Sequence, residues 1–311
     1  MNKVNEISAV TKDRDSLERK LRVLALTTLI ATYLLIVLGS TVRVTESGMG
    51  CNGWPLCSGQ IGPIDQYHPL LEQSHRYLAT IVTILIFAIA VVTWRAGARA
   101  YYLRGLSIAG VAVIAVQIVL GAITVLTNNA PATVALHLIV GLIFLAITTI
   151  TTVRAFAGSK SSWNPIRGLD KSAIWAVAGI FLVLISGSLV VDGGAEAACP
   201  SWPVCIGSHA QGGLIDLQLI HRGIVLIGSV LAVVYLLKIV RDKTRTAPHH
   251  TLALLGVLLL IIQIIAGAVV ALLKAPDALA DIHLALAAAL WAVIVAAAAV
   301  GEIRVSSQAK R

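Results

Sequence analysis

The sequence predicts an all-α polytopic membrane protein with eight transmembrane helices, arranged as two tandem four-helix bundles. Three observations support this prediction: the chain is 58% hydrophobic and only 13% charged, its apolar residues form long uninterrupted runs, and its second half repeats the pattern of its first. A soluble domain of 311 residues could not bury this much apolar surface. The continuous runs also differ from the short alternating segments of an outer-membrane barrel.

Each apolar run has about 20 residues or more, enough for a helix to cross a hydrocarbon core about 30 Å thick. The runs expected to form helices are residues 22–43, 72–94, 104–127, 132–156, 173–191, 217–240, 250–273 and 279–301. Glycines inside these runs, among them Gly121, Gly187 and Gly267, are expected to permit close packing between neighbouring helices.

The distribution of basic residues predicts the orientation in the membrane. An even number of spans places both termini on one side, and with the N-terminus inside, 20 of the 24 Lys and Arg residues fall in inner segments. Both termini are therefore predicted to be cytoplasmic. The net charge of +9 has the same explanation, and the scattered basic residues form no patch for nucleic acid. The N-terminal tail carries both signs of charge, which is not typical of a cleaved signal peptide or of a mitochondrial transit peptide. This favours location in a prokaryotic plasma membrane.

The internal repeat predicts the domain organisation. A Cys-x5-Cys motif around Trp-Pro recurs after 148 residues, and a His-Arg pair recurs after 146, so one two-residue deletion separates the copies. The predicted segments are an N-terminal tail (1–20), an N-terminal half (21–157), a linker (158–171), a C-terminal half (172–303) and a C-terminal tail (304–311). Because each half has an even number of spans, the halves should be related by a pseudo-two-fold axis along the membrane normal.

Four histidines begin the runs that enter from the outer side, within the first turn or two of each expected helix. They are His75, His137, His221 and His283, and the two in each half are 62 residues apart. Facing helices of a bundle commonly hold a metal between two imidazoles. No Cys or acid recurs with each pair to complete a zinc site, so the pattern favours haem with two axial histidines. The alternative is hydrogen bonding across helices.

Arginine follows the first histidine of each half. Arg76 and Arg222 are candidates to pair with haem propionates, because guanidinium groups suit carboxylates. The alternative is that both side chains extend to the membrane interface.

One acid breaks the symmetry between the halves. Glu72 lies three residues before His75, so both side chains can share a helix face, whereas the matching position holds Gln218. This difference suggests one chemical site and one cofactor site. The alternative is that Glu72 interacts with the dipole at the start of its helix.

The four cysteines lie in outer loops as the pairs Cys51/Cys57 and Cys199/Cys205. Disulfides persist outside the bacterial cytoplasm, so both pairs are expected to be oxidised. Metal binding, or a redox role for one pair, is the alternative.

This combination of residues resembles the haem A synthase family, in its form with eight transmembrane helices in two four-helix halves. The likeness covers roughly residues 20–303. It implies oxidation of the methyl group at ring position C8 of haem O to a formyl group, by successive hydroxylations and loss of water. The product, haem A, serves aa3-type terminal oxidases.

The resemblance also implies individual roles. His75 and His137 match the substrate haem O site, and His221 and His283 match the axial ligands of a haem b cofactor. Glu72 matches the functional acid, which could stabilise positive charge or accept a proton as the methyl is oxidised. The pair Cys51–Cys57 matches cysteines with a redox role, and Cys199–Cys205 a structural disulfide. Haem O synthase and an electron acceptor are the candidate partners beside haem O and the lipid bilayer.

Two other classes of protein remain open. A dihaem b electron-transfer cytochrome would explain four histidines, but it needs no acid in one half and usually places its haems at two depths. A transporter with parallel repeats would be expected to show broken helices and charges at mid-membrane, which this sequence lacks.

Overall fold

The computed structural model describes residues 2–51, 53–61, 65–159, 161–163, 170–207, 212–301 and 303–305. Parts of the predicted linker (160 and 164–169) and of the predicted C-terminal tail (306–311) lie outside the described residues. Within the described part, the long helices are α1 (Asn2–Val44), α2 (Tyr67–Ala96), α3 (Tyr101–Leu126), α4 (Pro131–Ala157), α5 (Lys171–Asp192), α6 (Gly212–Arg241), α7 (Ala247–Leu272) and α8 (Asp277–Gly301). Two short 3-10 helices, η1 (Ser47–Met49) and η2 (Gly97–Ala100), lie in the first half.

Every predicted apolar run coincides with one long helix, and most ends agree within about three residues. The exceptions are helix starts: α2 and α6 each begin five residues before the predicted run, and α1 extends back to Asn2. Hydropathy reports where a helix is apolar, whereas its backbone hydrogen bonds continue into the polar residues beyond the lipid.

Seven segments of the described chain are long and apolar enough to cross a membrane. One of them, Tyr67–Leu126, has 60 residues and contains α2, η2 and α3 in succession. Gly97 marks the change of direction between α2 and α3, because its φ of +59° is a conformation that glycine adopts readily. The chain is thus almost entirely helical and carries several apolar helices, as the sequence predicts.

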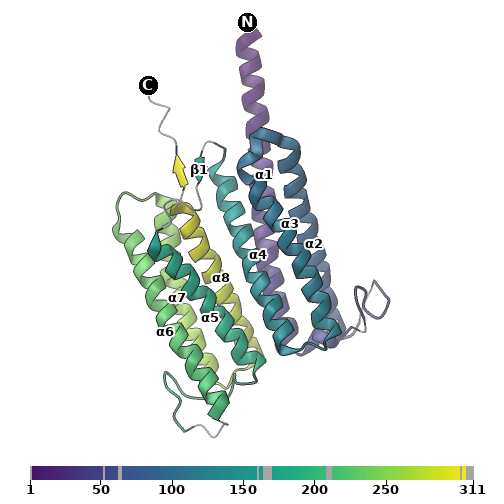
Figure 1. Ribbon diagram of the computed structural model, residues 1–311, viewed down its shortest axis with the longest axis vertical. Helices are drawn as coiled ribbons and strands as arrows, with labels where there is room; N and C mark the ends of the chain where they lie inside the picture. Colours follow the sequence, from purple (N-terminus) through teal and green to yellow (C-terminus); the bar gives the residue numbers. More distant parts are fainter. Residues whose placement is uncertain are drawn as a thin grey trace.

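The helices form two groups, α1–α4 and α5–α8, and the start of α1 and the end of α8 lie at the same end of the molecule (Figure 1). Within each group, consecutive helices pack against each other, and α1 and α4 also contact α8 of the other group. Gly179 of α5 lies against Gly228 of α6, where an added Cβ would be only 3.1 Å from the facing Cα. These two glycines do permit close helix packing.

Two short strands join segments that the sequence treats as separate. β1 (Ser161–Trp163) pairs antiparallel with β2 (Ile303–Val305), so part of the linker is hydrogen-bonded to the chain beyond α8. Three-residue strands leave no periodic signal in the sequence, which is why they were not predicted.

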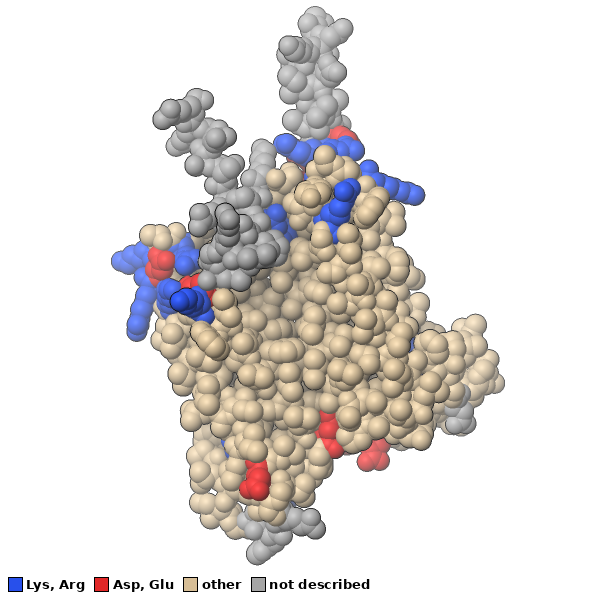
Figure 2. Space-filling view, viewed as in Figure 1, with Lys and Arg blue, Asp and Glu red and all other residues tan. Residues whose placement is uncertain are grey.

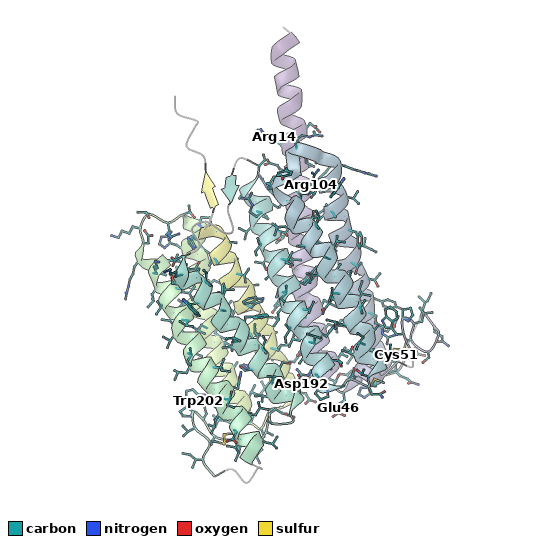
Figure 3. The ribbon with its side chains drawn as sticks, viewed as in Figure 1. Arg14, Glu46, Cys51, Arg104, Asp192 and Trp202 are labelled. Carbon is teal, nitrogen blue, oxygen red and sulfur yellow. A yellow bond between two sulfur atoms is a disulfide. The ribbon has the colours of Figure 1, made fainter. Side chains whose placement is uncertain are left out.

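Polar contacts join the two groups at the end opposite the termini. The Arg43 guanidinium donates to the Asp192 carboxylate and, at 3.2 Å, to the Ser188 carbonyl. Thr41 Oγ1 donates to Asp281 Oδ2 at 2.6 Å. Asp192 lies between the two helix groups (Figure 3). The repeat places Val191 opposite Arg43, so this ion pair exists because the two halves differ in sequence.

We expect Asp192→Ala to lower the free energy of unfolding by about 2 kcal/mol, because it leaves the partly buried Arg43 guanidinium without its carboxylate. Denaturant unfolding in detergent micelles measures the change. Asp216→Ala, at an exposed acid near the same end, is the matched control and should have little effect. Replacing both Arg43 and Asp192 by valine should recover most of the loss; equal instability of the single and double variants would contradict this account.

Candidate functional site

The four predicted histidines all lie near the N-terminal ends of helices that start at the end opposite the chain termini. His137 and His283 are in the second turns of α4 and α8, as predicted. His75 and His221 are in the third turns of α2 and α6, one turn deeper than predicted, because those helices begin earlier. Cys51 and Trp202 lie at this same end, far from Arg14 and Arg104 (Figure 3).

Each histidine ring packs against a glycine of the preceding helix. A Cβ added to that glycine would lie 2.9–3.3 Å from a ring atom, for the pairs Gly39–His75, Gly121–His137, Gly187–His221 and Gly267–His283. These distances are too short for any larger residue without movement of the ring. The prediction that Gly121, Gly187 and Gly267 permit close packing between neighbouring helices is therefore confirmed, and the group that each admits is an imidazole ring.

A glutamine contacts the second histidine of each half. The Nε2 of Gln117 is 3.2 Å from the Nε2 of His137, and the Nε2 of Gln263 is 3.3 Å from the Nε2 of His283. The amide oxygens of both glutamines and the Nδ1 atoms of both histidines are buried without a hydrogen-bond partner among the described residues. Orphaned buried polar atoms are costly, so each cluster has the character of a site that a ligand completes.

The histidines of each half lie within electrostatic range of each other, His75 with His137 and His221 with His283. Among the described residues, no group of three or more His, Cys, Asp and Glu could hold a metal ion. A bare zinc ion would need further protein ligands. A haem iron needs only two axial imidazoles, because the macrocycle supplies the other four nitrogens. The residues present therefore fit haem better than a bare metal.

Glu72 is 4% exposed and is bound on both carboxylate oxygens. Its Oε2 accepts from the backbone N–H of Cys51 at 2.7 Å, and its Oε1 accepts from the Arg76 guanidinium. Because α2 begins at Tyr67, Glu72 lies beyond the first turn, and the sequence alternative of a helix-end dipole partner is not supported. The acid instead joins the helix that carries His75 to the loop that carries Cys51.

Both arginines bind the cysteine loops in the same way. Arg76 Nη1 donates to the Pro55 carbonyl and Arg222 Nη1 to the matching Pro203 carbonyl, each at 3.1 Å. Arg222 Nη2 also donates to the Cys199 carbonyl at 2.9 Å. The disulfides Cys51–Cys57 and Cys199–Cys205 are both formed, as predicted. Each loop is therefore closed by a disulfide and held against its helix by an arginine.

The chain matches the family model COX15-CtaA, described as cytochrome oxidase assembly protein, over residues 22–69 and 65–295. It belongs to this family. The match covers all four histidines, Glu72 and both cysteine pairs. With its apolar helices, membership of COX15-CtaA makes this chain a multi-pass membrane protein.

Curated proteins similar in sequence to this COX15-CtaA chain carry the name "Heme A synthase". That of Geobacillus thermodenitrificans is 29% identical over 265 residues, which cover 82% of this chain and 83% of the relative. That of Alkalihalophilus pseudofirmus is 28% identical over 261 residues, 81% of this chain and 87% of the relative. That of Geobacillus kaustophilus is 28% identical over 268 residues, which cover 82% of this chain and 83% of the relative.

Sequence reasoning missed the neighbours of the histidines in this COX15-CtaA chain. Gln117 and Gln263 occupy matched positions 146 residues apart, and a polar residue repeated inside an apolar helix is itself a signal that could have identified them. The arginines were expected at haem propionates, and their contacts with loop carbonyls were not foreseen. No local pattern indicates such contacts, since they join residues about 20 positions apart across a loop.

We expect Gly267→Ala to reduce the amount of haem bound per protein, because the new methyl group would lie 2.9 Å from Cε1 of His283 and displace its ring. The pyridine haemochrome spectrum of the purified protein measures haem content. Gly223→Ala in α6 is the matched control, since nothing lies within 4 Å of its added Cβ. Alanine favours helix by about 1 kcal/mol, so the control should fold at least as well. Equal haem content in both variants would contradict the ring contact.

Proposed function

We propose that this chain is a haem A synthase, an oxidoreductase that converts the C8 methyl group of haem O to a formyl group. In this proposal haem O binds between His75 and His137 in the N-terminal half. A haem b cofactor binds between His221 and His283 in the C-terminal half. The names of the curated relatives and membership of the COX15-CtaA family support the proposal.

The observation that carries the proposal is that one of the two repeated sites has an acid where the other has an amide. In both halves a glycine lies beside each histidine, and a helix arginine donates hydrogen bonds to carbonyls of the cysteine loop. At the matched position, however, Glu72 accepts a hydrogen bond from its loop, whereas Gln218 donates to the carbonyls of Ala195 and Glu196. A carboxylate exchanges protons and an amide does not. We therefore assign the chemistry to the first half.

Glu72 is positioned for proton exchange by two partners. Cys51 N–H and the Arg76 guanidinium each take one carboxylate oxygen, which fixes the orientation of the group beside the turn that holds His75. Each oxygen keeps a further lone pair for a proton released as the methyl group is oxidised. When bound, haem b would supply the redox chemistry of the second half. Haem O synthase and an electron acceptor are the proposed partners.

The outer loops have proposed roles at these sites. A guanidinium has five N–H donors, so Arg76 and Arg222 can reach haem propionates while they hold loop carbonyls. The Cys51–Cys57 disulfide is proposed to take part in redox chemistry, and the backbone N–H of Cys51 binds Glu72. The Cys199–Cys205 disulfide is proposed to be structural.

The proposed topology has eight membrane crossings in a prokaryotic plasma membrane, with both termini in the cytoplasm. Residues 21–157 and 172–303 form its two four-helix halves, related by pseudo-two-fold symmetry along the membrane normal. Lys and Arg gather at the end of the molecule where α4 and α8 end (Figure 2), which supports this orientation.

The haem extracted from the purified protein tests the function directly, after expression in cells that supply haem O. We expect chromatography to separate haem A and haem B from the extract. Two haem B per chain with haem O left unchanged would instead identify a dihaem electron-transfer cytochrome without haem-modifying activity.

We expect Glu72→Gln to abolish conversion of haem O, by 10²-fold or more as is typical for loss of acid–base catalysis, while haem B stays bound. Folding should survive, because glutamine occupies the matched position in the second half and its carbonyl can still accept from Cys51 N–H. The matched control is Gln218→Leu, which loses loop contacts but no acid and should still convert haem O. Unchanged turnover in Glu72→Gln would refute the role of the acid.

A further inference from the structure

His221 differs from the other three histidines in what it contacts through Nδ1. The hydroxyl oxygen of Ser186, one residue before the glycine that faces this ring, lies 2.8 Å from that nitrogen. Ser186 is a helix residue of α5 and only 7% exposed. Its hydroxyl also donates to the backbone carbonyl of Val183 at 2.9 Å.

Together, these two contacts favour one position for the imidazole proton. A serine hydroxyl has one proton, and the Val183 carbonyl can only accept, so the hydroxyl proton lies on that side. The Ser186 oxygen must then accept from a proton on Nδ1 of His221. The Nε2 atom of this ring is left with a bare lone pair, which is the form that binds a metal.

No equivalent contact occurs at the other sites in the described part of the chain. The repeat places Leu38 opposite Ser186, and leucine offers no acceptor to His75. The Nδ1 atoms of His137 and His283 are buried without a partner among the described residues. Besides the difference between Glu72 and Gln218, the two histidine sites thus differ in one buried hydroxyl.

We propose that Ser186 is a positioning residue that anchors the resident haem of the C-terminal half through His221. A metal-bound histidine whose other N–H is donated to an acceptor has a fixed ring orientation and is a more basic ligand. The first half lacks this anchor at Leu38, which suits a site whose haem is a substrate and has to leave as product. This inference rests on the proposed function, since it assumes that the C-terminal half holds the cofactor.

The test is Ser186→Ala in the full-length protein purified with its haem. We expect the haem of the C-terminal half to transfer to apomyoglobin about 10-fold faster or more, the usual effect of losing such a partner. Its reduction potential should also rise, because a less basic imidazole stabilises ferric iron less. If the affinity for haem fell tenfold in the ferric form alone, the reduction potential would rise by about 59 mV.

Two further variants separate positioning from packing. Ser186→Thr keeps the hydroxyl and should restore both the transfer rate and the potential. Ser188→Ala removes a buried hydroxyl from the same turn of α5, but one that donates to Asp192 at 2.9 Å, so the potential should not change. A potential unchanged in Ser186→Ala, or shifted equally in Ser188→Ala, would overturn the proposal.

The reciprocal variant tests the difference between the halves. Leu38→Ser supplies the missing hydroxyl beside His75, and we expect the haem of the first half to dissociate more slowly than in the wild type. Unchanged dissociation there would overturn the explanation of substrate release. A wild-type protein that binds no haem b would refute the proposed function itself, whereas haem b bound equally well without Ser186 would refute only this inference.

Discussion

Contact between a histidine ring and a helix glycine governs how the helices of this chain pack. An imidazole inside an apolar helix bundle needs polar partners from the protein, because lipid supplies no hydrogen bonds. It also needs space between closely packed helices. Glycines on α1, α3, α5 and α7 supply the space for rings on α2, α4, α6 and α8. Each helix must therefore meet the next at one register, which fixes how consecutive helices pack.

The outer loops extend this arrangement beyond the helices. A disulfide closes each loop, and an arginine one residue after a histidine binds its carbonyls. Movement of a loop is thereby coupled to the helix that carries the histidine. In the first half, Glu72 strengthens the coupling and adds an ionisable group, so loop, acid and proposed ligand form one connected unit.

The duplicated scaffold has diverged at polar residues that contact the sites or join the halves. Glu72 stands against Gln218, Ser186 against Leu38, and Arg43 against Val191. The apolar helices and the glycines beside the histidines keep the frame the same in both halves, while a few polar substitutions change what each half can bind or exchange. This pattern is expected when two similar sites acquire different tasks, because a buried polar group affects its neighbours far more than an exposed one.

Sequence alone predicts the helices, the histidine pairs, the cysteine pairs and the acid that lacks a counterpart. These features are local or periodic along the chain, so hydropathy and the repeat reveal them. Which atoms meet becomes visible only in the folded chain: the glycine beside each ring, the backbone N–H of Cys51 at Glu72, and the hydroxyl of Ser186 at His221. Such contacts depend on the rotation and register of helices packed against each other, and residues far apart in the chain set these together.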